Sequence, residues 1–312
     1  MEAVEKVKNT FGTEQAERKK LSPGQFLLVL ILGLYGMICL LPMVLIGIVS
    51  FSSETSIDKN GFSFFPDEWS LKAFDYVYTF KDQLIQSYKV TIFETVVGTV
   101  ITLLLTGMFA YTLSRKSFRL RKGLSVYLLI TMLFGGGLLG GYLVNTNIWK
   151  LRNNLLVLVI PGCVSAWNCI IMRTFIQSNV PDSLIEAAKI DGAGEVHTFF
   201  RIILPIMVPV LAAIGFMSAI GHWNEWQTAF LYIDNPDYAT LQLMLIRIEK
   251  NLSYLQERLD YLSPKELEML KNAPTESARM ALLLFTIGPV MIAYPFFQKY
   301  FIKGITIGAV KG

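Results

Sequence analysis

Charged side chains are scarce in this chain of 312 residues, where they make up 17% of the sequence. A soluble domain carries about a quarter. Cysteine and histidine are also rare, and the three cysteines (Cys39, Cys163 and Cys169) lie in apolar runs without a CxxC pair or a neighbouring histidine. These absences argue against a disulfide framework and a metal site. The formal net charge of +4 is too small to indicate a nucleic-acid partner.

Apolar residues account for 53% of the sequence and gather in long runs. A membrane's hydrocarbon core of about 30 Å is crossed by about 20 apolar helical residues. Six runs come close to or exceed that length. The sequence therefore predicts an all-α polytopic membrane protein with about six transmembrane helices, over residues 26–50, 88–113, 124–144, 155–176, 203–221 and 281–302.

Lysine and arginine in the connecting segments predict the orientation, because cytoplasmic loops are enriched in them. Residues 1–25 are basic, and loop 114–123 holds five basic residues, whereas loop 51–87 is mainly acidic. Both termini and loop 177–202 are then expected in the cytoplasm, and loop 222–280 outside. The expected order is a cytoplasmic segment 1–25, a first transmembrane helix 26–50, an external loop 51–87, a transmembrane core 88–302 and a cytoplasmic tail 303–312.

The long loop 222–280 has features of its own. Leu241, Leu245 and Ile248 recur at helical spacing, and residues 263–266 read as a capping box. Two amphipathic helices are expected. They either cover the outer end of the helix bundle or dock an extracytoplasmic partner, and the sequence leaves both possibilities open.

Loop 177–202 contains the most informative pattern. Pro181, Asp182 and Ser183 favour the start of a helix, and Gly192 favours a sharp turn at its end. A short, slim helix is therefore expected at the membrane surface, where it suits a groove on a partner protein. The next membrane helix is expected to begin at Leu204-Pro205.

The residues of this loop resemble the EAA signature of ABC importer permeases at every position and spacing. The matching residues are Glu186, Ala187, Ala188, Asp191, Gly192, Ala193, Ile202, Leu204 and Pro205. The chain is similar to the carbohydrate branch of that family along nearly its whole length, most closely to the maltose-type second permease and to aldouronate-type permeases. Glu-Ala-Ala alone is common in ordinary surface helices, but the full register is specific.

The resemblance implies a type I ABC importer permease fold in the bacterial inner (cytoplasmic) membrane. It implies a heterodimer with a second permease subunit, two ABC ATPase subunits beneath it, and an extracytoplasmic solute-binding protein that delivers a carbohydrate, most simply an oligosaccharide. Glu186, Ala187, Ala188, Asp191, Gly192, Leu204 and Pro205 would couple this chain to an ATPase. The sequence contains no P-loop, so ATP hydrolysis is expected on another subunit, and neither a cofactor nor a catalytic residue is expected here.

Other residues allow two interpretations each. Trp223, Asn224 and Trp226 suit a sugar pathway, because sugars stack on aromatic rings and bond to amides, but they equally suit an aromatic belt at the membrane surface. Glu94 is expected to reach the interface or to pair with Lys89. The glycines at 135–137 and 140–141 are expected to allow close helix packing. An ion-coupled secondary transporter is the alternative function, although the scarcity of charge in the membrane segments argues against it.

Overall fold

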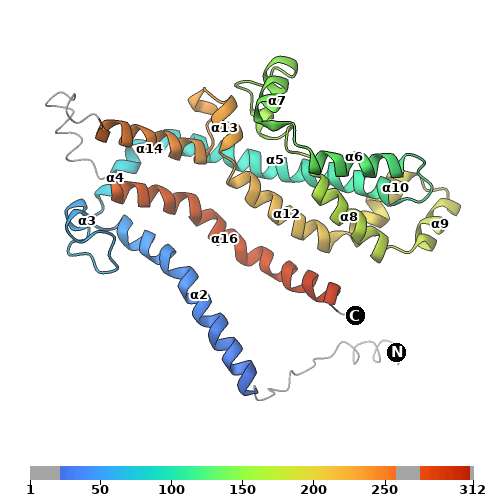
Figure 1. Cartoon of the computed structure of the whole chain (residues 1–312), viewed down its shortest axis with the longest axis horizontal. Helices are drawn as coiled ribbons and strands as arrows, with labels where there is room; N and C mark the ends of the chain where they lie inside the picture. The colour runs from blue at the N-terminus through green and yellow to red at the C-terminus, as the bar shows by residue number, and fades with distance from the viewer. Residues whose placement is uncertain (1–21, 258–274, 310–312) are drawn as a thin grey trace, which may run out of the picture.

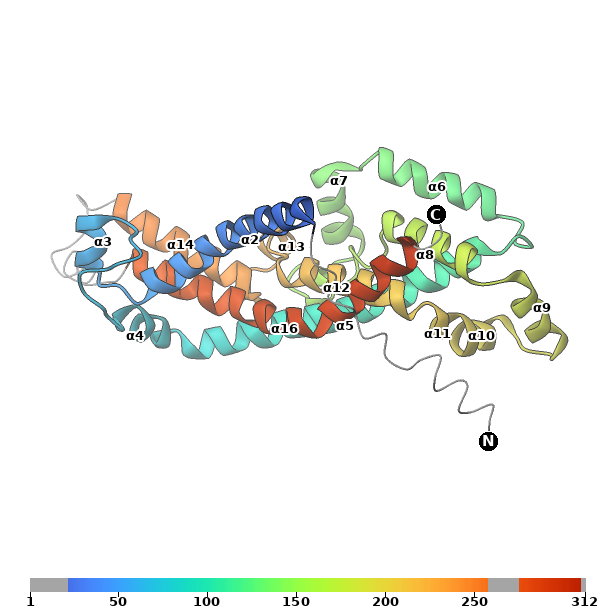
Figure 2. The same ribbon diagram turned by 90° about the horizontal axis from the view of Figure 1, so that it is seen from below.

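The computed structural model describes residues 22–257 and 275–309, and every regular element in these ranges is a helix (Figure 1). The molecule is elongated. Helices α3 (Glu54–Asn60) and α4 (Lys72–Thr79) lie at one end of the long axis, and α9 (Asp182–Ile190) lies at the other (Figures 1 and 2). The predicted capping box at 263–266 lies outside the described residues.

Three long helices form the frame. They are α2 (Pro23–Ser50), α5 (Lys81–Ser114) and α16 (Glu276–Ala309), and each contains an apolar stretch long enough to cross a membrane. Helix α2 begins with a capping box in which Ser22 and Gln25 bond to each other's backbone N–H groups. It contacts α16 but exposes its apolar side chains over most of its length. Such a surface requires lipid or another protein chain.

The run predicted as a helix over 124–144 is bent. Helix α6 (Arg121–Leu133) meets α7 (Gly137–Leu143) at 114°, and η1 (Val144–Ile148) continues α7. Gly137 adopts a φ of +72° at the bend, a conformation that glycine tolerates best. No other part of the described chain approaches within 4 Å of the Cβ position at Gly136 or Gly140. Within the described residues these glycines make no close helix contact: Gly135 and Gly136 lie at the bend, and Gly137, Gly140 and Gly141 lie in α7.

The run predicted over 155–176 is also interrupted. A short helix, η2 (Leu155–Leu158), is followed by an irregular segment, and α8 (Ala166–Asn179) begins only after it. Pro161 and Gly162 lie in the break, and both are poor helix formers. The Ser165 hydroxyl then accepts a hydrogen bond from the Asn168 N–H and caps the new helix. Local backbone chemistry therefore overrides the length of the apolar run.

The chain beyond α9 reaches the next long helix through several short elements. These are α10 (Glu195–Thr198), η3 (Phe199–Ile203) and α11 (Leu204–Ile206), followed by α12 (Val208–Trp223). The stretch ending at Ile206 and α12 meet at 82°. The three long helices and the two bent pairs give up to five candidate crossings in the described residues, which is roughly consistent with the expected number of about six.

Helix α12 packs along α5 in the opposite direction. A side chain at Gly98 would meet the imidazole of His222, and one at Gly107 would lie close to Met207. Gly98 is near the middle of α5, so α12 ends opposite the middle of α5 and not at its tip. The chain after Trp223 therefore lies against the first half of α5, where Gln86 donates a hydrogen bond to the Asp237 carbonyl.

That later segment is helical, as predicted. It contains α13 (Gln227–Tyr232), η4 (Pro236–Tyr238) and α14 (Leu241–Glu257). Leu241, Met244 and Ile248 of α14 are buried in one apolar cluster with Ala73, Val77, Leu84 and Trp223. This face of α14 thus completes the bundle within the chain.

Candidate coupling loop and solute pathway

Helix α9 presents two different faces. Ile185 and Ala188 are buried and point into the molecule, and Ile185 belongs to an apolar cluster that includes residues of α5, α8 and α12. Glu186 and Ala187 are exposed. At the end of the helix, Ile190 is 85% exposed, which is unusual for a large apolar side chain. The exposed face is therefore available to another protein, and the buried face fixes the helix to the bundle.

Gly192 ends this helix in a sharp turn, as predicted, and it does so with a positive φ. Its φ is +77°, its N–H bonds to the Lys189 carbonyl, and the Ala193 N–H bonds to the Ala188 carbonyl. These two bonds form the Schellman arrangement that satisfies the last carbonyl groups of a helix. Nothing lies within 4 Å of the Cβ position at Gly192, so glycine is required there by backbone conformation and not by space.

Two side-chain contacts tie the loop to the end of α5. The Tyr111 hydroxyl donates a hydrogen bond of 2.6 Å to Glu195 Oε2, and Lys116 Nζ lies 2.8 Å from Asp182 Oδ2. The hydrogen bond from Lys116 holds the pKa of Asp182 below its usual range. Sequence reasoning missed both pairs, since the partners are far apart along the chain and no local pattern links them.

The remaining signature residues lie around the bend. Asp191 is exposed beside Gly192. Leu204 is partly buried and packs against the apolar cluster that holds Ile185, whereas Pro205 is exposed. Proline lacks an N–H and fits the first turn of α11. The structure thus places the signature residues along one continuous path from the tip of α9 to the start of α12.

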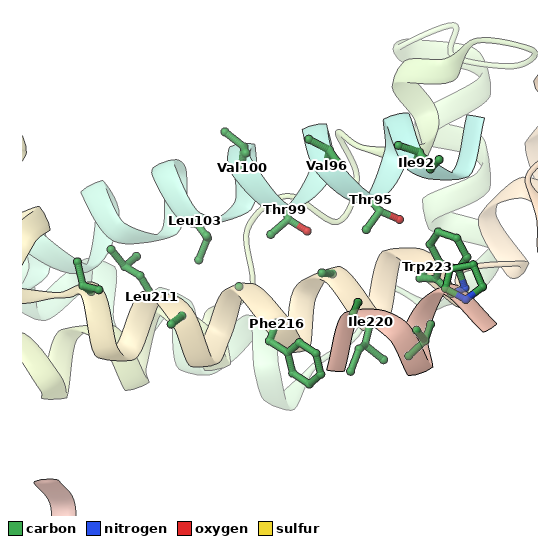
Figure 3. Close-up of a pocket in the computed structure, with 17 residues that line it drawn as sticks. Ile92, Thr95, Val96, Thr99, Val100, Leu103, Leu211, Phe216, Ile220 and Trp223 are labelled. Carbon is green, nitrogen blue, oxygen red and sulfur yellow. The ribbon is translucent and has the colours of Figure 1, made fainter. Parts of the chain in front are cut away.

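The contact between α5 and α12 has a hollow on each side. The first is an apolar cleft of about 750 Å³ that α16 also borders. Thr95, Thr99 and Leu103 point from α5 toward α12 in this cleft (Figure 3). Its other wall includes Leu211, Phe216 and Trp223 (Figure 3). Apart from the two threonines, apolar side chains dominate this side.

The predicted pathway residues separate in the structure. Trp223 is 8% exposed, and its indole N–H donates a 3.0 Å hydrogen bond to the Thr286 carbonyl in α16. Trp226 is 47% exposed and packs against Phe230. Asn224 is exposed, and its side chain bonds to the Ile220 carbonyl. Trp223 is therefore a packing residue at the edge of the cleft, while Trp226 and Asn224 remain accessible to a solute.

The second hollow is a chamber of about 260 Å³ with polar and apolar lining residues, on the other side of the α5–α12 contact. The segment between η2 and α8 borders it, so the break in the 155–176 run forms one of its walls. Its polar lining residues are Thr102, Ser165, Asn168, Ser218, His222, Glu225 and Thr228. Sequence reasoning missed this grouping, because the residues come from three separate segments.

Glu94 and His222 lie next to one another at the level of this chamber. Glu94 is fully buried, its Oε1 is 3.8 Å from His222 Nδ1, and neither carboxylate oxygen has a hydrogen-bond partner in the described residues. The expectation that Glu94 reaches the interface or pairs with Lys89 was wrong. The reason is tertiary: Gly98, one turn further along α5, leaves room for the His222 ring beside it.

Comparisons with known proteins agree on one family. The model of the family described as binding-protein-dependent transport system inner membrane component matches residues 103–307. The Bacillus subtilis polygalacturonan/rhamnogalacturonan transport system permease protein YtcP is 33% identical, over 89% of this chain and 95% of its own length. The Halalkalibacterium halodurans arabinooligosaccharides transport system permease protein AraQ is 27% identical, over 95% of this chain and 100% of its own.

One solved structure is also similar along nearly the whole chain. It is a chain in the crystal structure of a bacterial ABC transporter involved in the import of the acidic polysaccharide alginate. The TM-score is 0.75 at 27% identity, and the match covers 95% of this chain and 98% of that one.

Proposed function

The chain belongs to the family of binding-protein-dependent transport system inner membrane components, and on that premise we propose that it is the permease subunit of an ATP-driven importer for an oligosaccharide. The permease names of its relatives support the transport role, and the arabinooligosaccharides relative supports the solute class. The observation that carries the proposal is α9, a helix whose inner face is anchored in the bundle and whose outer face is open.

The proposed assembly contains this chain, a second permease, two ATPase subunits and an extracytoplasmic solute-binding protein. No P-loop occurs in the sequence, so the ATPases supply the energy. The exposed apolar surface of α2 fits a role in contact with lipid and the second permease. Glu186, Ala187 and Ile190 would enter a groove on one ATPase, in the manner of a helix bound in a groove.

Movement of that ATPase is proposed to pass into the bundle through few contacts. Ile185 packs against the cluster of α5, α8 and α12, and the Tyr111–Glu195 hydrogen bond links the loop to α5. The bend at Met207 then separates the loop from α12. A shift of α9 is therefore transmitted to α12, which lines both the cleft and the chamber. Solute on one side of the membrane and ATP on the other would shift the same equilibrium between two conformational states of the importer.

In the proposed orientation, α9 and both termini are cytoplasmic, and α3, α4 and α14 are external. The asymmetry of lysine and arginine supports it. Cysteine labelling of intact cells on a cysteine-free background tests it. An impermeant maleimide is expected to label Lys59→Cys, in the exposed part of α3, and to leave Ser183→Cys unlabelled until the cells are opened. The reverse pattern would invert the topology.

Reconstitution tests the transport function. The purified chain is expected to co-purify with a permease partner and an ATPase. Proteoliposomes that contain the full complex are expected to take up an oligosaccharide only when ATP and the solute-loaded binding protein are both present. A preparation without a bound ATPase, or ATP-independent uptake, would contradict the proposal.

An ion-coupled secondary transporter is a second candidate, because of one observation. Glu94 and His222 form a buried ionisable pair, and such pairs inside membrane helices serve proton or ion coupling in some transporters. The two candidates differ in their inhibitors. Ion-coupled uptake is abolished by a protonophore or ionophore and does not respond to vanadate, whereas ATP-driven uptake is expected to show the opposite response.

A further inference from the structure

The chamber beside the α5–α12 contact is lined partly by side chains that can bond to hydroxyl groups. It lies near the middle of α5, since its wall includes Thr102 of α5 and Ser218 of α12. Its volume of about 260 Å³ falls just below the usual range of small-molecule pockets, about 300–1,000 Å³. A space of this size holds one sugar unit and not a whole oligosaccharide.

One hydroxyl in the chamber has no partner. Thr102 is 3% exposed, and its Oγ1 makes no hydrogen bond within the described residues. Buried polar groups are almost always hydrogen-bonded, because leaving them unpaired costs free energy. A hydroxyl group of a bound sugar can both donate to and accept from this oxygen. The hydroxyls of Thr95, Thr99 and Thr106 in α5 are also unpaired among the described residues, but Thr102 is the only one of these four that lines the chamber, where a bound sugar can pair with it.

The rest of the wall matches the same chemistry. Ser165, Asn168, Ser218 and Thr228 provide both donors and acceptors, and Glu225 provides an acceptor. Glu225 is itself held in place, since its Oε1 accepts a 2.7 Å hydrogen bond from the Thr228 N–H. Val157, Leu158 and Pro161 add an apolar surface on which the C–H face of a sugar ring can rest.

The charges near the chamber select against an acidic sugar. None of the residues that line it is lysine or arginine, Glu225 is in its wall, and the buried Glu94 lies behind His222. A uronic acid would bring another carboxylate into a low-dielectric site without a lining cation, and like charges there repel strongly. An uncharged sugar meets no such penalty.

We propose that this chamber is a subsite in which the chain itself holds one uncharged sugar unit of the passing oligosaccharide, through Thr102, Ser218 and Glu225. This inference rests on the proposed function. It sets the chain apart from its relative named for polygalacturonan transport and from the alginate importer, whose solutes are acidic. Glu94 lies beside the His222 ring and is not part of the wall of the chamber.

The test uses the full importer in proteoliposomes, with its binding protein. The probes are radiolabelled arabinotriose and galactotriose, which are neutral, and trigalacturonate, which is acidic. The wild type is expected to import at least one neutral probe about tenfold faster than trigalacturonate. Thr102→Val is expected to lower the uptake per ATP hydrolysed by about tenfold, without changing the binding protein's affinity for the probe. Glu225→Gln is expected to reduce the discrimination against trigalacturonate by about fivefold.

Two variants serve as controls. Thr106→Val makes the same substitution one turn further along α5, at a threonine that is equally buried but does not line the chamber, and is expected to leave uptake per ATP unchanged. Thr102→Ser keeps the hydroxyl and is expected to restore uptake. A misfolded variant would lose stimulated ATP hydrolysis as well, whereas loss of the subsite leaves it intact.

The outcomes separate the two proposals. Equal uptake per ATP in Thr102→Val and Thr106→Val would overturn the subsite while leaving the importer function in place. Import of trigalacturonate at the rate of a neutral probe would overturn the uncharged specificity. If ATP drove the uptake of none of the probes, and the purified complex also lacked a bound ATPase, the proposed function itself would be overturned, and the subsite with it.

Discussion

The two ends of the molecule hold their helices in different ways. At the end that carries α4, Trp223 is buried with an indole hydrogen bond to Thr286, and the Glu54 carboxylate accepts hydrogen bonds from Thr275, Glu276 and Ser277 at the start of α16. At the other end, α9 itself is held by one exposed ion pair and two buried side chains, Ile185 and Ala188, and the Tyr111–Glu195 hydrogen bond holds the chain just beyond it. One end is locked by buried polar contacts, and the other is attached at a few points.

That difference suits a coupling segment at the α9 end that moves relative to a rigid helix bundle at the α4 end. A loop that must transmit the movement of a partner needs a stiff helix, a defined turn and few restraints. The α4 end instead keeps α5, α12, α14 and α16 in register around the cleft. Changes at the α9 end should therefore affect coupling more than stability, and changes at the α4 end should affect stability more than coupling.

The largest effect is expected at Gly192. In Gly192→Val the residue must adopt a φ of +77°, which costs about 1–2 kcal/mol and is worse for a β-branched side chain. The chief consequence is that α9 is aimed wrongly, so uptake and solute-stimulated ATP hydrolysis are expected to be lost while the protein still inserts in the membrane. Glu186→Lys is expected to give the same result through the ATPase contact. Pull-down of the ATPase and ATP hydrolysis in proteoliposomes are the measurements.

Gly194 provides the matched control. Its φ is −73°, and its Cβ position is also free of neighbours, so Gly194→Val meets no strain and no clash. It is expected to keep most of the uptake. If Gly192→Val and Glu186→Lys both retained full ATPase binding and full solute-stimulated ATP hydrolysis, the α9 end would not be the coupling element.

The next effect concerns the two tryptophans. Trp223→Ala removes a buried ring and its hydrogen bond, and large-to-small changes of this kind cost about 3–5 kcal/mol. Trp226→Ala removes an exposed ring, so stability should change by less than about 0.5 kcal/mol. If Trp226 stacks on the solute, its loss lowers uptake by about two- to tenfold, from about 0.5–1.5 kcal/mol of stacking. Thermal unfolding of the purified complex and uptake kinetics separate the two roles.

A smaller effect is expected at Glu54, and it depends on pH. Partial burial alone would raise the pKa of this carboxyl, but the hydrogen bonds from Glu276, Thr275 and Ser277 outweigh burial and hold the pKa below its usual value. A lowered pKa means that the stabilisation is fully present above the unfolded-state pKa and fades as the pH falls through the folded-state value. Glu54→Ala is expected to cost about 1–3 kcal/mol at pH 7.

The pH dependence supplies the check on Glu54. The difference in unfolding free energy between Glu54→Ala and the wild type should shrink at acidic pH, below the ordinary carboxyl pKa of about 4.3. A difference that stayed constant down to that range would mean that the charge of Glu54 does not stabilise the α16 start.

The smallest effect is expected for Lys116 and Asp182. Both side chains are largely exposed, and exposed ion pairs contribute little to stability because water and salt screen the charges. Lys116→Ala should leave the unfolding temperature nearly unchanged. If it nevertheless lowered the uptake per ATP, the pair would act in the positioning of α9 and not in its stability.

The sequence by itself determined the features that depend on local chemistry. The apolar runs predicted the membrane class, the spacing of Leu241, Leu245 and Ile248 predicted the helix α14, and loop 177–202 predicted a short helix that ends in a sharp turn at Gly192. Each of these is set by side chains or backbone preferences within a few turns of one another. Such information is present in any short window of the sequence. The breaks at Pro161, Gly162 and the glycines at 135–137 also follow from local backbone chemistry, although the apolar runs predicted continuous helices there.

Tertiary structure decided the rest. Only packing brought Glu94 to His222 and Thr102 to Ser218, because the end of α12 lies opposite the middle of α5. Pairings of this kind depend on the register between distant helices. That register is set by the sum of many contacts along α5, such as the fit of His222 against Gly98, and no local pattern records it.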